Sequence, residues 1–328
     1  MFSRGRGVKT MIDPAEDFAQ AIEDMTGYRP KETILPGRMY RFSTSSKRSD
    51  TAGWCKLFLD DRTGVYGDHR TGLSSVWVAK STKPPTLAER QQRADELSLA
   101  RAKAAARQSE EWALAAARNA ETWALACPVR AGDPVAKYLE NRGLRLNCWP
   151  EALRYHSHLP YFDGDRSLGR YPAMLGAVTD ATGQLVSVHR TYLTRDGHKA
   201  DLPVVKKLAG CSARLAGCSV KLYPPAFVHG VPSIGVAEGI ETALACFMAS
   251  EVPTMSAISA HGLSYYQWPQ EVKNLMIYAD NDVSQVGQRA AETLAQRARK
   301  AGLAEQVLTP PSSDIDWADV WSALVKAI

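Results

Sequence analysis

Apolar runs and helical segments alternate regularly through residues 234–328, and this alternation limits the possible folds more than any other part of the sequence does. The apolar runs have the length and continuity of buried strands, and the segments between them have the composition and period of helices. The strand runs are SIGVAE, TMSAIS, NLMIYAD and AEQVLTP, and the helical segments are GIETALACFMAS, QVGQRAAETLAQRARKAG and DWADVWSALVKA. Continuous apolar strands separated by helices predict a buried, mainly parallel sheet, so we expect an α/β domain here.

Three acidic residues stand at the carboxyl ends of two of these strands. Glu238 ends IGVAE, while Asp280 and Asp282 follow LMIYA. In an open α/β sheet ligands bind outside the carboxyl ends of the strands, so we expect these carboxylates to meet at one edge. There they would repel one another, and a divalent cation would relieve the repulsion. All-oxygen ligation suits Mg²⁺ or Mn²⁺, and two-metal phosphoryl transfer uses such clusters.

Each of these carboxylates also has a purely structural interpretation. Asp280 could be an ordinary strand-end residue, and Asp282 with Ser284 could cap the following helix. The glutamate on the neighbouring strand favours the metal site. A second acidic group, in SSDIDWADVW, contains Asp316, which we predict as an additional metal or nucleotide contact. A helix-capping role for this second group fits the sequence equally well.

Charge is distributed unevenly along the chain. Residues 128–235 contain 14 basic and 8 acidic side chains, whereas residues 236–328 contain 6 basic and 11 acidic ones. A basic surface attracts phosphate, and an acidic segment joined to it could hold metal ions. Two ordinary solvated surfaces would give the same pattern, so charge alone does not decide between these interpretations.

The first 127 residues are predicted to form a helix, a small sheet and a long helix. Residues 13–27 carry helix-capping signals at both ends, and residues 32–80 contain short aromatic and β-branched runs separated by turn residues. Residues 86–127 include 14 alanines and neither glycine nor proline, which favours one helix. Its predicted apolar stripe consists of Trp112, Ala116, Ala120, Trp123 and Cys127. The predicted parts of the chain are 1–85, 86–127, 128–235 and 236–328.

The motifs VAEGIETALA, MIYADND followed by GQRAA, and DWADVW resemble a Toprim domain of the kind found in DNA primases of phages, plasmids and integrative elements. Upstream, AMLGAVTD, QLVSVHRTYL, DGHKA and KKLAG resemble the basic half of a bacterial-type primase catalytic core. GWCKLF and GVYGDHRTG resemble the N-terminal module of the same mobile-element primases. The resemblance implies an α/β fold class, which is α+β over the whole chain. Along the chain, a small N-terminal β module, a long helix and a basic mixed α/β subdomain would precede a Toprim-type parallel sheet with helices on both faces.

The resemblance also implies roles for individual residues. Glu238 would be the acid–base or metal residue, and Asp280 and Asp282 would be ligands of two Mg²⁺ or Mn²⁺ ions. A further set would contact nucleotide or template. This set comprises Arg190, Lys206, Lys207, His189, Lys199 and His261. The pair Lys206–Lys207 could equally lie in a solvated loop, and His261 could equally belong to a plain strand-to-helix turn.

The resemblance implies a DNA primase, that is, a nucleotidyltransferase that would make short RNA primers on single-stranded DNA for replication of a mobile element or phage. The expected partners are the template, ribonucleoside triphosphates and a separate helicase or replication initiator, because no GxxxxGKS or GxxxxGKT motif is present. Two alternatives stay open. One is a Toprim nuclease, because two-metal sites also cut phosphodiesters. The other is a non-catalytic factor for single-strand binding or loading, which aromatics beside basic residues in YRF and WCK would suit.

The cysteines and the hydropathy pattern exclude other classes of protein. None of the six cysteines forms a CxxC pair, so we expect no zinc site. No run of 18 apolar residues occurs, which predicts no contact with a membrane. Scattered cysteines and an N-terminus without an apolar signal segment predict a cytoplasmic protein.

Overall fold

The computed structural model describes residues 13–46, 50–79 and 87–327. The chain divides into two compact units, Met1–Lys103 and Ala104–Ile328, and the division falls within one long helix. The predicted boundary between residues 85 and 86 lies outside the described residues. Each unit has a hydrophobic core of its own.

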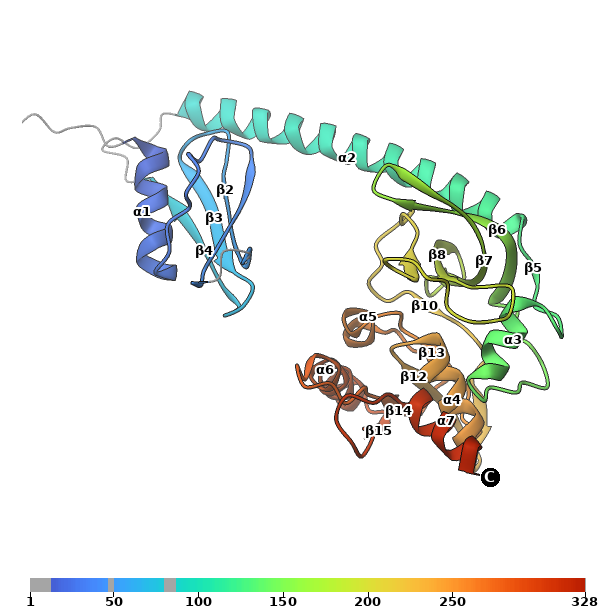
Figure 1. The fold of residues 1–328 in the computed structure, drawn as a ribbon. Coiled ribbons are helices and arrows are strands. Elements are labelled where there is room, and N and C mark those ends of the chain that lie inside the picture. The colour runs from blue at the N-terminus through green and yellow to red at the C-terminus, as the bar shows by residue number, and fades with distance from the viewer. Residues whose placement is uncertain (1–12, 47–49, 80–86, 328) are drawn as a thin grey trace, which may run out of the picture. The chain divides into compact units, whose positions relative to one another are not determined.

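The first unit is a four-stranded antiparallel sheet with one helix packed on it (Figure 1). Helix α1 (Pro14–Thr26) is capped by the Asp13 carboxylate, which accepts a hydrogen bond from the amide of Ala15. Strands β1 (Met39–Phe42), β2 (Gly53–Leu57), β3 (Thr63–Asp68) and β4 (Leu73–Val78) pair in chain order. Side chains alternate between the two faces of each strand, so one face of the sheet carries the buried apolar residues. Phe18 and Ile22 of α1 are fully buried against this face.

The second unit is built on one eleven-stranded mixed sheet. Its main path runs β15-β14-β12-β13-β10-β7-β6-β5, with β8 paired to β7 and β9, and β11 paired to β12. The strands are β5 (Cys127–Pro128), β6 (Leu153–Asp163), β7 (Arg166–Thr179), β8 (Leu185–Tyr192), β9 (Lys206–Leu208), β10 (Ser219–Val220), β11 (Ala226–Val228), β12 (Val231–Ala237), β13 (Thr254–Ser256), β14 (Asn274–Tyr278) and β15 (Ala304–Leu308). A short helix, α3 (Pro134–Asn141), precedes β6.

Strands β15, β14, β12 and β13 are parallel and carry helices on both faces. Helices α4 (Ile240–Ser250) and α7 (Trp317–Ala327) contribute to the core on one face, and α5 (Ala260–Tyr265) and α6 (Val286–Lys300) contribute to the core on the other. The predicted parallel sheet with helices on both faces is therefore confirmed.

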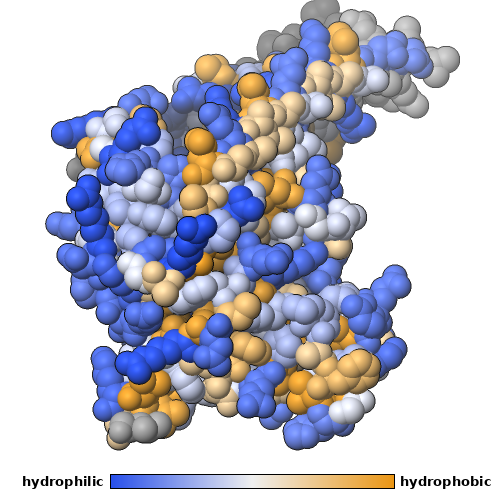
Figure 2. Space-filling model, turned by 90° about the vertical axis from the view of Figure 1, so that its right-hand side faces the viewer, coloured by the Kyte–Doolittle hydropathy of each residue, from blue (hydrophilic) through white to orange (hydrophobic). Residues whose placement is uncertain are grey.

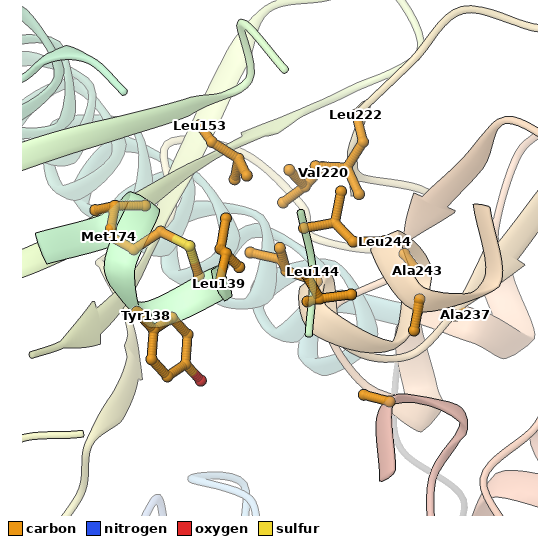
Figure 3. Packing of buried hydrophobic residues seen from close by; sticks show 14 of the residues in the cluster. Tyr138, Leu139, Leu144, Leu153, Met174, Val220, Leu222, Ala237, Ala243 and Leu244 are labelled. Carbon is orange, nitrogen blue, oxygen red and sulfur yellow. The ribbon is translucent and has the colours of Figure 1, made fainter. Parts of the chain in front are cut away.

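The basic half and the acidic half of the chain share this sheet. Val220 of β10 pairs with Val178 of β7 on one side and with Ser256 of β13 on the other. Figure 3 shows the common core, in which Leu153 and Met174 lie in one cluster with Val220 and Leu244. The sequence pattern did not predict this continuity, because a two-residue strand has no recognisable period.

The long helix α2 (Leu87–Ala124) ends at Ala124 rather than at the predicted residue 127, since Cys127 and Pro128 enter the sheet as β5. The predicted apolar stripe is only partly right. Ala120 is exposed, whereas Asn119 is buried and its side-chain amide donates hydrogen bonds to the carbonyls of Val186 and Gly210. The end of α2 is thereby fixed to the sheet of the second unit.

Within the described ranges, no helix is long and apolar enough to span a membrane. Figure 2 shows one face of the molecule, on which hydrophobic residues lie in patches among hydrophilic ones.

Candidate active site

A small cavity of about 190 Å³ opens at the carboxyl ends of β12 and β14, beside β8 and β9. Three acidic side chains line it, namely those of Glu238, Asp280 and Asp316. Two basic residues, His189 and Lys206, line it from the other half of the sheet. The cavity therefore joins the two oppositely charged halves of the sequence. Its remaining lining residues are Gly239, Ile240, Thr242, Ser256 and Ile258.

Parallel register brings Glu238 and Asp280 to the same edge. Ala237 pairs with Tyr278, so Glu238, one residue beyond Ala237, and Asp280, two residues beyond Tyr278, leave neighbouring strands at the same edge of the sheet. The backbone around Glu238 is fixed by its neighbours, because its carbonyl accepts hydrogen bonds of 2.8 Å from both the Ser256 hydroxyl and the Ile258 amide. Ile258 holds a φ of +72°, a strained conformation for a β-branched residue. Such strain is typical of backbone that a functional site constrains.

The environment of Asp280 disfavours its ionised form. Burial, followed by the charges of Glu238, Asp316 and Asp282, raises the pKa of Asp280 to about 7. Burial also raises the pKa of Glu238. Oδ1 of Asp280 is buried and has no hydrogen-bond partner among the residues that the structure describes. A buried carboxylate oxygen without a hydrogen-bond partner, in a cavity that two other carboxylates line, is the type of donor that a hard divalent cation takes.

Asp316 reaches the cavity because a loop is held against β14. The Asn281 side-chain amide donates to the carbonyls of Pro310 at 2.9 Å and Ser312 at 3.0 Å, and Asn281 also forms a backbone bridge with Ile315. Asp316 in addition accepts a hydrogen bond of 2.8 Å from the amide of Asp319 at the start of α7. Both sequence interpretations of Asp316, helix cap and site residue, are thus compatible with its position.

Asp282 points instead to the start of α6. Its carboxylate accepts hydrogen bonds from the amides of Gly287 at 3.1 Å and Val286 at 3.3 Å, and from the Ser284 hydroxyl. These bonds, that of Ser284 first, lower the pKa of Asp282. Asp282 is not among the residues that line the cavity, so its role as a metal ligand stays a prediction.

The three carboxylates share the cavity without forming a closed ligand set. No group of three histidine, cysteine, aspartate or glutamate side chains among the described residues is close enough to hold a metal ion. The residue types nevertheless fit Mg²⁺ or Mn²⁺, which take few protein ligands and complete their shell with water and phosphate.

Lys206 is held at the cavity by a buried carboxylate that the sequence analysis missed. Its ammonium lies 2.8 Å from Oε2 of Glu241, whose side chain is only 4% exposed. The Tyr138 hydroxyl donates to the other oxygen of Glu241 at 2.7 Å. Burial opposes ionisation of Glu241, but Lys206 and then the Tyr138 hydrogen bond hold its pKa at about 2. Glu241 lies in the first turn of α4, within the VAEGIE motif that already contains Glu238.

The two members of the predicted lysine pair lie on opposite faces of the sheet. In the β8–β9 register Thr191 pairs with Lys206, and Arg190 pairs with Lys207. Adjacent strand residues alternate in direction, so Arg190 and Lys207 face away from the cavity. Lys207 instead lies over the Tyr161 ring, with its ammonium 4.0 Å from the ring centroid.

The three remaining predicted residues differ in position. His189 lines the cavity, and burial lowers its pKa to about 4, so its ring is neutral near pH 7. Lys199 is exposed in the loop after β8. His261 is exposed at the start of α5, where its ring lies 4.7 Å from that of Tyr265. Neither Lys199 nor His261 lines the cavity.

Comparison with protein families agrees with this geometry. Residues 233–326 match the model described as Toprim domain, so the predicted Toprim domain is confirmed and contains all three carboxylates of the cavity. Residues 113–221, which supply Lys206 and His189, match a model described as Domain of unknown function (DUF7146). No curated protein sequence matches the chain.

Several solved primase structures are similar to the chain. A DNA primase domain from Pseudomonas aeruginosa is 15% identical, with 60% of this chain and 68% of that chain covered and a TM-score of 0.39. The Aquifex aeolicus primase, with zinc-binding and RNA polymerase domains, is 13% identical. The match covers 97% of this chain and 84% of that chain, with a TM-score of 0.40. The DnaG primase catalytic domain bound to single-stranded DNA is 12% identical. The match covers 68% of this chain and 82% of that chain, with a TM-score of 0.42.

Proposed function

We propose that the chain is a DNA primase, which joins ribonucleotides into short RNA primers on a single-stranded DNA template by metal-dependent nucleotidyl transfer. The observation that carries the proposal is the meeting of three Toprim carboxylates with Lys206 at one cavity. In this reaction the 3′-hydroxyl of the growing primer attacks the α-phosphorus of a ribonucleoside triphosphate. The hydroxyl loses its proton, and pyrophosphate leaves.

The carboxylates would hold the metal and the basic residues would hold the substrate. Asp280, with its unpartnered oxygen, together with Glu238 and Asp316, would ligate Mg²⁺ or Mn²⁺. When bound, the cation supplies charge stabilisation and an acidified 3′-hydroxyl. Lys206 supplies a positive charge for the triphosphate, and Glu241 keeps its ammonium at the cavity wall. The neutral His189 ring can donate or accept a hydrogen bond there without adding charge.

The test is incubation of the full chain with single-stranded DNA, four ribonucleoside triphosphates and Mg²⁺ or Mn²⁺, followed by sizing of labelled products. We expect products of several ribonucleotides with the wild-type chain, and none with Asp280→Asn. The matched control is Glu271→Gln, which neutralises an exposed carboxylate remote from the cavity lining. Absence of products with the wild type would refute the proposal. Shortening of the labelled template would support the nuclease alternative, and binding without chemistry would support the non-catalytic one.

Three finer statements belong to this proposal and stay predictions. The primers would serve replication of a phage or other mobile element, a separate helicase or initiator would open the template, and the enzyme would work in the cytoplasm.

A further inference from the structure

The sheet of the first unit has two unlike faces. Its inward face carries Tyr40, Phe42, Tyr66 and Trp77, which form a buried core with α1. Its outward face carries the cross-strand row Arg41–Trp54–Gly67–Ser74 and, beside it, the row Met39–Lys56–Val65–Val76. Met39, Arg41, Ser74 and Val76 are exposed, and Trp54, Lys56 and Val65 are half-buried. Two of the six aromatic residues in these strands and turns, Trp54 and Phe58, are therefore left out of the core.

The indole of Trp54 lies along the surface of this outward face. Gly67, its neighbour across the strands, leaves the space that the indole occupies, since a Cβ at Gly67 would meet Trp54 Cζ2 at 2.8 Å. The His69 ring lies 5.9 Å from the indole at 34° and adds a second ring to the same area. A flat, partly exposed indole supported by backbone offers a stacking surface for another ring.

Positive charge flanks the indole. Arg41 is its cross-strand neighbour, and Lys56 follows two residues along the same strand. The Lys56 ammonium lies 5.9 Å from the centroid of the Phe58 ring, so this ring is on the same side of the sheet. The described strand residues of the outward rows include no carboxylate, whereas Glu16, Asp17, Glu23 and Asp24 are on α1, which covers the inward face. The face therefore complements an anionic chain that carries exposed rings.

We propose that this outward face, defined by Arg41, Trp54, Lys56 and Phe58, is a binding site for single-stranded DNA. Trp54 would stack on an unpaired base, while Arg41 and Lys56 would contact phosphates on either side of it. A duplex keeps its bases stacked inside and cannot offer them to the indole. The choice of DNA rather than RNA rests on the proposed function, but the stacking site itself requires no catalysis.

The first experiment measures binding of an oligothymidylate of about 10 nucleotides to the full chain. We expect Trp54→Ala to raise Kd about 5-fold to 150-fold, the range given by one lost base stack, and Trp54→Phe to restore most of the affinity. The association constant falls as salt rises, and Arg41→Ala should make the slope of its logarithm against log salt shallower by about 0.7. The matched controls are Leu59→Ala, an exposed apolar residue in a turn, and Lys31→Ala, an exposed basic residue outside the strands.

The second experiment locates the contact without relying on affinity. Oligonucleotides that carry 5-iododeoxyuridine are crosslinked to the full chain by light, and the modified peptides are mapped. We expect crosslinks to the peptide that contains Trp54, in addition to any within the second unit. Circular dichroism and thermal melting of the Trp54 variants test whether the first unit is still folded.

Three outcomes would overturn the inference. They are an unchanged Kd for folded Trp54→Ala, crosslinks confined to residues 104–328, and equal or tighter binding of oligouridylate. The inference and the proposed function fail separately. Trp54-dependent binding without primer synthesis would refute only the proposed function, whereas primer synthesis that is indifferent to Trp54, with no crosslink there, would refute only the stacking site.

Discussion

Replacement of Glu241 by glutamine is predicted to destabilise the second unit by about 3 kcal/mol at pH 7. The carboxylate is 4% exposed and lies 2.8 Å from the Lys206 ammonium. Its pKa falls from the ordinary 4.5 to about 2 in the fold, and each pKa unit corresponds to about 1.4 kcal/mol. Loss of one partner from a buried ion pair has a cost of similar size. Lys206 is 40% exposed and can regain water, so its unpaired charge adds little.

The pH dependence of this effect has a defined sign. A carboxyl whose pKa is lower in the folded chain stabilises the fold above the unfolded pKa, and this contribution is lost as pH falls through the folded value. The difference in stability between the wild type and Glu241→Gln should therefore be constant near neutral pH. It should shrink between about pH 5 and pH 2.

The assay is denaturant unfolding followed by circular dichroism at pH 7 and at pH 3, with Glu271→Gln as the control on an exposed carboxylate. A double variant with Lys206→Met isolates the pair, because the two single effects should not add. Additive effects, or a variant as stable as the wild type at pH 7, would refute the assignment of this ion pair as a structural support of the cavity.

Three further predictions concern the cavity and its rim. Asp280→Asn should abolish primer synthesis without lowering the melting temperature, since it removes a buried charge without a partner; scanning calorimetry checks this. Lys206→Ala should weaken ribonucleotide binding more than Arg190→Ala does, because only Lys206 lines the cavity; titration with a non-hydrolysable triphosphate compares them. Asn281→Ala removes two hydrogen bonds to the loop that carries Asp316, so unfolding should become easier by about 1–2 kcal/mol and primer synthesis should decline.

The parallel part of the sheet was predictable from sequence because its strands are continuous apolar runs with carboxylates at their ends. The same reasoning placed Glu238 and Asp280 at one edge, and register alone brings them together. It did not place Lys206 there. The position of Lys206 depends on β9, a three-residue strand whose pairing with β8 sets which of the two lysines faces the cavity.

Glu241 and Asn281 were missed for a related reason. Each is close to a predicted site residue in sequence, but its role comes from a partner far along the chain: Tyr138 and Lys206 for Glu241, and the 310–312 segment for Asn281. Hydrogen bonds between distant segments leave no periodic signal. Asp282 is the opposite case. Its hydrogen-bond partners lie only two to five residues further along the chain, so the sequence already indicated that it could cap the following helix, and the structure contains these bonds.

The pairing of β10 with β13 restricts how the chain can be divided. All three residues of β13 are buried, and β10 pairs with β13 on its outer side through Val220 and Ser256. A fragment that began at β12 would leave the outer side of β13 without its partner, and an uncovered strand edge can pair with another chain. Such a Toprim fragment should aggregate, whereas a fragment that keeps β10 and the end of α2 should stay monodisperse in size-exclusion chromatography. The acidic half thus needs β10 of the basic half to cover this edge, and we expect an insertion or recombination point between them at residue 230 to be poorly tolerated.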